Sequence, residues 1–148
     1  KRPDFGPKQM NLKAGATAIG CRGPLIAFNV FLDSQDIAIA KKIANAISES
    51  KGGLKFVKAL GFELESRNQV QISMNLTDYR QTHLHEVFES IKIETERFGV
   101  AIAFSEIVGL IPFEVAAKIV NFYLRLQGFT KDKVLEERLK DTASKGIQ

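Results

Sequence analysis

The order in which the spacing of apolar residues changes along the chain is the feature that most restricts its fold. Strand-like apolar runs or alternation occur along 25–32, 56–65, 70–76 and 100–104, whereas apolar residues recur every three or four positions along 35–48 and 82–98. Alternation is typical of a strand with one buried face, and the longer recurrence is typical of an amphipathic helix. The sequence therefore predicts the order strand, helix, strand, strand, helix, strand.

This order predicts an α/β (α+β) fold, a ferredoxin-like βαββαβ sandwich with helices on one face of a mostly antiparallel sheet. Extra C-terminal helices are expected over 112–127, with Pro112 as the first helical residue, and over 132–141. The loop between the last strand and these helices is expected over 105–111, and residues 142–148 are expected to be frayed.

Helix caps and an N-terminal arm complete the expected organisation. Asp33 or Ser34 is expected to cap the first helix, and Thr82 the second. Residues 1–24 hold three of the four prolines, which predicts an irregular arm, with a short strand over 14–19, before a domain of residues 25–148.

Asn29 lies in the middle of the first predicted strand, where an amide must find a hydrogen-bond partner or cost stability. It belongs to the sheet face that the helices would leave open, together with other small or polar residues. The residues expected on that face are Ala27, Asn29, Gln71, Ser73, Asn75, Ala101 and Ala103. Such a face is either solvated, as in many antiparallel sheets, or packed against a ligand or another domain.

Few other residues suggest chemistry. Arg22 is either an anchor for a carboxylate or phosphate or an exposed loop residue. His83 and His85 are two positions apart at a helix start, where they would point to different faces and form a poor metal pair. Cys21 is the single cysteine, which excludes an intramolecular disulfide and fits a reducing, cytoplasmic setting. The residues alone indicate no catalytic triad, metal site or carboxylate pair.

Charge and hydropathy argue against two classes of partner. The net charge is +4, but the 21 basic and 17 acidic residues are interspersed, which disfavours a nucleic-acid patch. A nucleic-acid-binding sandwich would also need stacking aromatics on the open face, where only Phe31 is expected. No apolar run approaches the length of a membrane span. We therefore expect neither nucleic acid nor membrane as a partner.

Several long motifs, in the same order, resemble the C-terminal subdomain of glutamate formiminotransferase, in the formiminotransferase-cyclodeaminase family. They are Pro-Asp-Phe-Gly-Pro at 3–7, Gly-Ala-Thr-Ala-Ile-Gly-Cys-Arg at 15–22, Leu-Ile-Ala-Phe-Asn at 25–29, Val-Gln-Ile-Ser-Met-Asn-Leu-Thr-Asp at 70–78 and Ser-Glu-Ile-Val-Gly-Leu-Ile-Pro at 105–112. The resemblance implies transfer of a formimino group from N-formimino-L-glutamate to N5 of tetrahydrofolate, in histidine degradation, without a metal.

The resemblance also implies how the site is assembled. Two α/β subdomains would face each other across a tunnel that holds the folate. The catalytic His, which would carry the proton to the leaving nitrogen, belongs to the N-terminal subdomain. This chain would therefore supply no catalytic residue and would be inactive alone. The folate-site residues that the resemblance implies are Gly6, Pro7, Lys8, Gln9, Met10, Asn11, Leu12, Lys13, Ala14, Gly15, Arg22 and Asn29.

Two hypotheses follow for the chain. It is either the folate-binding half of a formiminotransferase, whose partners are both substrates and an N-terminal subdomain, or a non-catalytic binding or assembly module derived from that family. A homo-oligomer is compatible with both.

Overall fold

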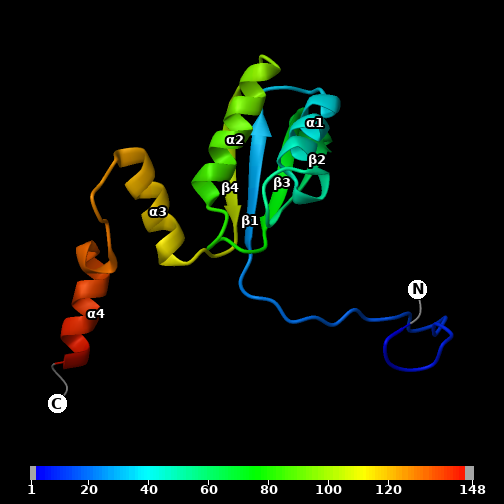
Figure 1. Ribbon diagram of the computed structural model, residues 1–148, viewed down its shortest axis with the longest axis horizontal. Coiled ribbons are helices and arrows are strands. Elements are labelled where there is room, and N and C mark those ends of the chain that lie inside the picture. Colours follow the sequence, from blue (N-terminus) through cyan, green and yellow to red (C-terminus); the bar gives the residue numbers. More distant parts are fainter. Residues whose placement is uncertain (1–2, 146–148) are drawn as a thin grey trace.

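A four-stranded antiparallel sheet with two helices on one face forms the centre of the computed structural model, which describes residues 3–145 (Figure 1). The elements are β1 (Ile26–Leu32), α1 (Ile37–Ile47), β2 (Val57–Leu64), β3 (Gln69–Leu76), α2 (Leu84–Arg97) and β4 (Ile102–Val108). The strands are ordered β2-β3-β1-β4, and each neighbouring pair is antiparallel. The predicted α/β class is confirmed, and the element order agrees with the expected ferredoxin-like sandwich.

The hydrophobic core lies between the sheet and helices α1 and α2. Alternate residues of β1 and β3 point into it, as their spacing predicted, because successive side chains of a strand point to opposite faces. The buried strand residues are Ile26, Phe28, Val30 and Leu32 in β1 and Val70, Ile72, Met74 and Leu76 in β3. The helices contribute Ala40, Ile43, Ala44 and Ile47 from α1 and Leu84, Val87 and Ile91 from α2.

Strand β2 approaches α1 unusually closely at Gly61. A Cβ atom at this position would lie 2.6 Å from the backbone nitrogen of Lys41 and 2.7 Å from the carbonyl carbon of Ala40. Only a residue without a side chain fits there, and the larger residues Leu60 and Phe62 therefore lie on the opposite, open face.

Strand β4 is longer than predicted and carries an irregularity. It runs to Val108 rather than ending at Phe104, so part of the predicted loop over 105–111 is strand. Phe31 pairs with Phe104 but Leu32 pairs with Ile102, which leaves Ala103 as an extra residue. Such a bulge shifts the alternation of side chains between the two faces.

The cap of α1 differs from the prediction. The N-cap is Asp36, whose carboxylate accepts a hydrogen bond of 2.8 Å from the backbone N–H of Ala38. Ser34 instead accepts a bond of 3.1 Å from the N–H of Asp36, and Asp33 lies outside the helix. The prediction of Asp33 or Ser34 was wrong because three candidate caps occur within four residues.

The cap of α2 also differs. The N-cap is His83, and the carboxylate of Glu86 accepts its backbone N–H at 2.9 Å. The hydroxyl of Thr82, the predicted cap, donates to the carbonyl of Lys55 at 2.7 Å and so anchors the loop after α1.

Two further helices follow the sheet: α3 (Phe113–Leu124) lies beside α2, and α4 (Leu135–Lys145) lies farther from the sheet (Figure 1). Pro112 is the N-cap of α3 rather than its first residue, and α3 ends before Arg125, whose φ is 52°. Residues 142–145, predicted to be frayed, belong to α4, whereas 146–148 lie outside the described residues. Within residues 3–145, no helix is long and apolar enough to cross a membrane.

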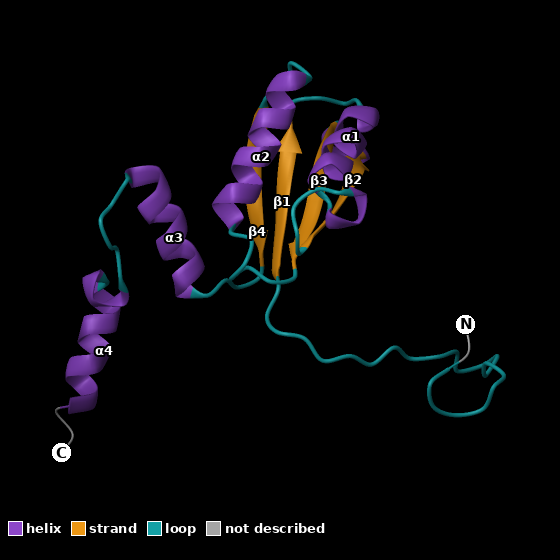
Figure 2. Ribbon diagram, viewed as in Figure 1, coloured by secondary structure: helices purple, strands orange, loops and turns teal. Residues whose placement is uncertain are grey.

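The N-terminal arm extends away from the sandwich (Figure 2). The strand predicted over 14–19 is not formed, and an isolated bridge joins Asn11 to Gly15 instead. Gly15 donates its N–H to the carbonyl of Asn11 at 2.7 Å, and the side-chain oxygen of Asn11 accepts from Lys13 and Ala14. The arm is therefore irregular, as predicted, and closes a small local turn.

Candidate functional site on the open sheet face

The pairing of the four strands aligns three rows of side chains across the open face. The rows, written from β2 to β4, are Lys58–Asn75–Ala27–Val108, Leu60–Ser73–Asn29–Glu106 and Phe62–Gln71–Phe31–Phe104. Residues that are directly opposite in neighbouring strands lie close enough to interact. The face therefore has a polar middle row with an aromatic row on one side of it.

The middle row carries the predicted site residue Asn29 next to Ser73 and Glu106. Asn29 is half-buried, and its side-chain amide makes no hydrogen bond within residues 3–145. Glu106 is exposed, and no ion pair in the same range involves it. An amide, a hydroxyl and a carboxylate thus offer both donors and acceptors to a partner that this part of the chain does not supply.

The aromatic row was not predicted. Phe31 is 4% exposed and stacks on Phe104 with the ring centroids 4.2 Å apart, while Phe62 and Phe104 are 44% and 41% exposed. The expectation that Phe31 would be the only aromatic residue here was wrong, because Phe62 and Phe104 lie in the same row. Ala101, also expected on this face, lies outside β4, and Ala103 is the unpaired residue of the bulge. The bulge at Ala103 turns Phe104 toward the open side.

Apolar side chains at both edges make this face a poor surface for permanent exposure. Leu60 is 64% exposed and Val108 is 49% exposed, on the two outer strands. Apolar positions around convergent polar groups are typical of a ligand or domain interface. The geometry favours the second of the alternatives that the sequence left open, a covered face.

The remaining predicted site residues lie apart from the sheet. Residues 6–15 are exposed and belong to the arm, where 11–15 form the turn. The guanidinium of Arg22 donates to the carbonyl of Gly23 at 3.3 Å and contacts no residue of the open face. Of the twelve residues, the structure thus brings only Asn29 onto the sheet.

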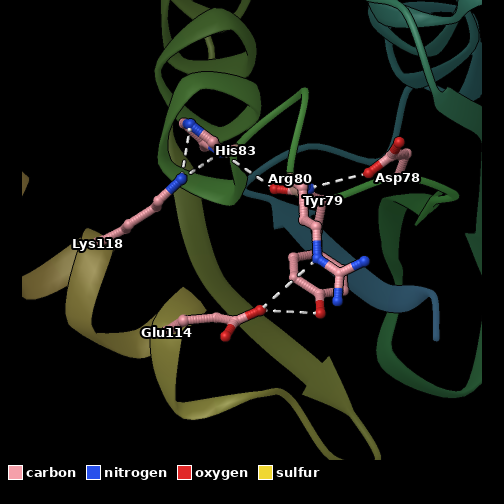
Figure 3. A network of polar contacts seen from close by, with 6 residues as sticks. All are labelled: Asp78, Tyr79, Arg80, His83, Glu114 and Lys118. Carbon is pink, nitrogen blue, oxygen red and sulfur yellow. Dashed lines mark hydrogen bonds and ion pairs between the residues drawn. The ribbon is translucent and has the colours of Figure 1, made fainter. Parts of the chain in front are cut away.

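A second polar cluster joins α3 to the loop before α2, away from the open face (Figure 3). The Tyr79 hydroxyl donates to Glu114 at 3.0 Å, and Arg80 lies 4.0 Å from the same carboxylate. The ammonium of Lys118 lies 3.0 Å from Nε2 of His83, which also contacts the Tyr79 carbonyl through Nδ1. The polar groups of this cluster thus pair with one another and connect α3 to the loop before α2.

The expectation that His83 and His85 would point to different faces was wrong. Their rings stack with centroids 5.6 Å apart, because His83 is the N-cap and lies outside the helical rotation. Nearby, His85 borders an apolar cavity of about 360 Å³ whose lining includes Phe28, Phe88 and Tyr123. Burial lowers the pKa of His85, and its Nδ1 is buried without a partner within residues 3–145.

Comparison with known proteins decides the family. A formiminotransferase domain family model matches residues 27–142. The chain belongs to the formiminotransferase domain family. It is 46% identical to the glutamate formimidoyltransferase of Thermoplasma acidophilum over 143 residues, which cover 97% of this chain and 47% of that protein.

Other relatives give the same result. The glutamate formimidoyltransferase of Streptococcus pyogenes serotype M1 is 43% identical, over 93% of this chain and 46% of that protein. The formimidoyltransferase-cyclodeaminase of Dictyostelium discoideum is 35% identical, over 93% of this chain and 27% of that protein. This formiminotransferase-family chain thus spans about half the length, or less, of the curated relatives it matches.

The family match includes the open face and excludes the whole arm of residues 1–24. It begins at residue 27, one residue after β1 starts, and so contains Asn29, Ser73 and Glu106. Within residues 3–145, no three His, Cys, Asp or Glu side chains gather to hold a metal ion.

Proposed function

We propose that this chain is the folate-binding half of a glutamate formimidoyltransferase, and that its open sheet face forms one wall of the substrate site. The observation that carries the proposal is the row Ser73–Asn29–Glu106, whose side chains have no partner in the described part of the chain and which is flanked by exposed apolar residues. A second subdomain facing it would bury the apolar residues and leave the polar row to bind substrate. The twofold greater length of the relatives supports such a subdomain.

The substrates in this proposal are tetrahydrofolate and N-formimino-L-glutamate. N5 of the folate attacks the formimino carbon, and the tetrahedral intermediate collapses when the leaving glutamate nitrogen takes up a proton. A His of the other half moves this proton. The residues of this chain bind and orient: the amide of Asn29 and the hydroxyl of Ser73 hydrogen-bond the polar edges of a planar ligand and hold the reactants in line.

The arm has a defined part in this proposal. Residues 6–15 would lie against the bound folate in the complete protein, with Arg22 close to the entrance of β1. These residues are exposed in this chain, which agrees with a segment that a facing subdomain covers in the complete protein. The protein would act in the cytoplasm, in histidine degradation, and is compatible with a homo-oligomer.

Activity measured on separate and combined halves tests the proposal. The chain alone should neither transfer the formimino group nor bind a stable folate analogue tightly in calorimetry. Addition of the N-terminal half of a glutamate formimidoyltransferase should produce both. Tight binding by this chain alone would contradict a shared site, whereas binding by both halves without transfer would favour the alternative, a non-catalytic module of the family.

A matched pair of variants tests the open face itself. In the combined, active protein, Asn29→Ala should lower kcat/KM by about tenfold to a hundredfold, since one or two hydrogen bonds to substrate are lost. Asn45→Ala, an equal change at an exposed position of α1, is the control and should leave the kinetics unchanged. Equal kinetics for both variants would refute the role of Asn29.

A further inference from the structure

Arg67 is held over the aromatic row of the open face. It lies in the short 3-10 turn Glu65–Arg67 between β2 and β3, which Asn68 closes with a φ of 52°. Its guanidinium carbon is 5.6 Å from the ring centroid of Phe31 and 5.7 Å from that of Phe104. The two stacked rings thus attract the cation and restrict its position.

The hydrogen-bonding capacity of Arg67 is unused. Within residues 3–145, its guanidinium has no ion pair and no hydrogen bond, although Arg80 and Arg97 pair with Glu114 and Glu94. A guanidinium that packs one plane against aromatic rings keeps the N–H groups along its edge available. Those donors match the two oxygens of a carboxylate, which Arg binds in a bidentate manner.

We propose that Arg67 binds a carboxylate of the glutamyl group of a substrate on the open face. The inference rests on the proposed function, because both proposed substrates, tetrahydrofolate and N-formimino-L-glutamate, carry such a group. It assigns the aromatic row a role in positioning: Phe31 and Phe104 orient Arg67, and Arg67 fixes the anionic end of the ligand.

The position of Arg67 along the sheet suits an elongated ligand. The arm enters β1 at Ile26, whereas the turn that carries Arg67 lies at the other end, where Leu32 pairs with Val70 (Figure 1). The four steps from Ala27 to Phe31 span about 13 Å at the usual rise of a strand. A folate lying along β1 would have one end near the arm and its glutamyl end near Arg67.

Steady-state kinetics of Arg67→Gln in the combined, active protein tests the inference. The KM of the substrate whose carboxylate is bound should rise about tenfold to a hundredfold, the effect of losing a charged hydrogen-bonded pair, with kcat little changed. Arg67→Lys, which keeps the charge but not the planar fork, should give an intermediate KM. It also serves as the second variant if Arg67→Gln does not fold.

Two substrate series distinguish the sources of the carboxylate. If the folate supplies it, the rise in KM should appear with tetrahydrofolate and vanish with tetrahydropteroate, which lacks the glutamyl group. If N-formimino-L-glutamate supplies it, only the KM of that substrate should rise. Either result supports the inference.

The control is Arg80→Gln, because Arg80 also lies over an aromatic ring, that of Tyr79 at 5.3 Å, but outside the open face. Its KM values should equal those of the unchanged protein. Unchanged KM values for both substrates in folded Arg67→Gln, beside an active parent protein, would overturn the inference alone. An inactive parent protein would instead overturn the proposed function, and the inference with it.

Discussion

Gly61 sets the distance between strand β2 and helix α1, so the replacement Gly61→Ala should destabilise the fold. The added Cβ would lie 2.6 Å from a backbone nitrogen and 2.7 Å from a backbone carbon of α1, whereas ordinary contacts begin at 3.4 Å. Backbone atoms cannot rotate away as a flexible side chain would. The helix must therefore move by about 0.8 Å to restore an ordinary contact.

The magnitude follows from what α1 buries. Its residues Ala40, Ile43, Ala44 and Ile47 are all at most 2% exposed in the core. A gap of about 0.5–1 Å already removes a quarter to a half of the dispersion energy of each contact. Overpacking of this kind lowers the free energy of unfolding by about 1–3 kcal/mol. In a chain of this size, each kcal/mol lost lowers Tm by about 2–4 °C.

Urea unfolding followed by circular dichroism measures this effect. The control is Gly23→Ala, since no heavy atom lies within 4 Å of the added Cβ at that position and the backbone needs no positive φ. The control should change the free energy of unfolding by less than about 1 kcal/mol and in the stabilising direction. Equal stability of the two variants would refute the close contact between β2 and α1.

Two further predictions concern the helices. Asp36→Ala should lower the free energy of unfolding by about 0.5–2 kcal/mol in urea titrations, because it removes the N-cap of α1. Asp33→Ala is the control and should have little effect. The reverse ranking of the two variants would refute the assignment of the cap. Burial lowers the pKa of His85, so the unfolded chain takes up a proton first and stability should fall as the pH drops below about 6.5. His85→Phe keeps a ring stacked on Phe122 and should reduce this loss of stability between pH 7.5 and 5.5 in the same titrations. An unchanged dependence of the free energy of unfolding on pH would contradict the assignment of this loss to His85.

The strands that pack centrally could be predicted from the sequence, and the outer strand β4 could not. In β1 and β3, alternate residues such as Val30 and Ile72 are buried with the period of a strand, and Phe31 is buried as well because it stacks on Phe104. In β4, the extra residue Ala103 breaks the alternation, and its effect depends on pairing with β1, a partner about 70 residues away. A local pattern carries no information about such a distant pairing, so the prediction ended β4 too early and put Phe104 on the wrong face.

The same reason explains what was missed in the site. Asn29 was placed on the open face correctly because the alternation of β1 fixes its side, but the partners of its row depend on register. Arg67 lies in the turn between β2 and β3, and nothing in the local sequence indicates that its side chain reaches Phe31. Pairing register and turn geometry thus decide which residues the site contains.

Gly61 and the bulge at Ala103 have a common consequence for the open face. The close contact at Gly61 leaves the large residues of β2 no place on the helix side, and the bulge turns Phe104 outward. Both features put apolar side chains at the margins of the face, with the polar row of Asn29 between them. A solvated face would gain nothing from this arrangement, whereas a second subdomain would bury the margins against itself and leave a polar channel between the sheets. Two local irregularities that expose apolar side chains in this chain would therefore both favour binding of a second subdomain over the face.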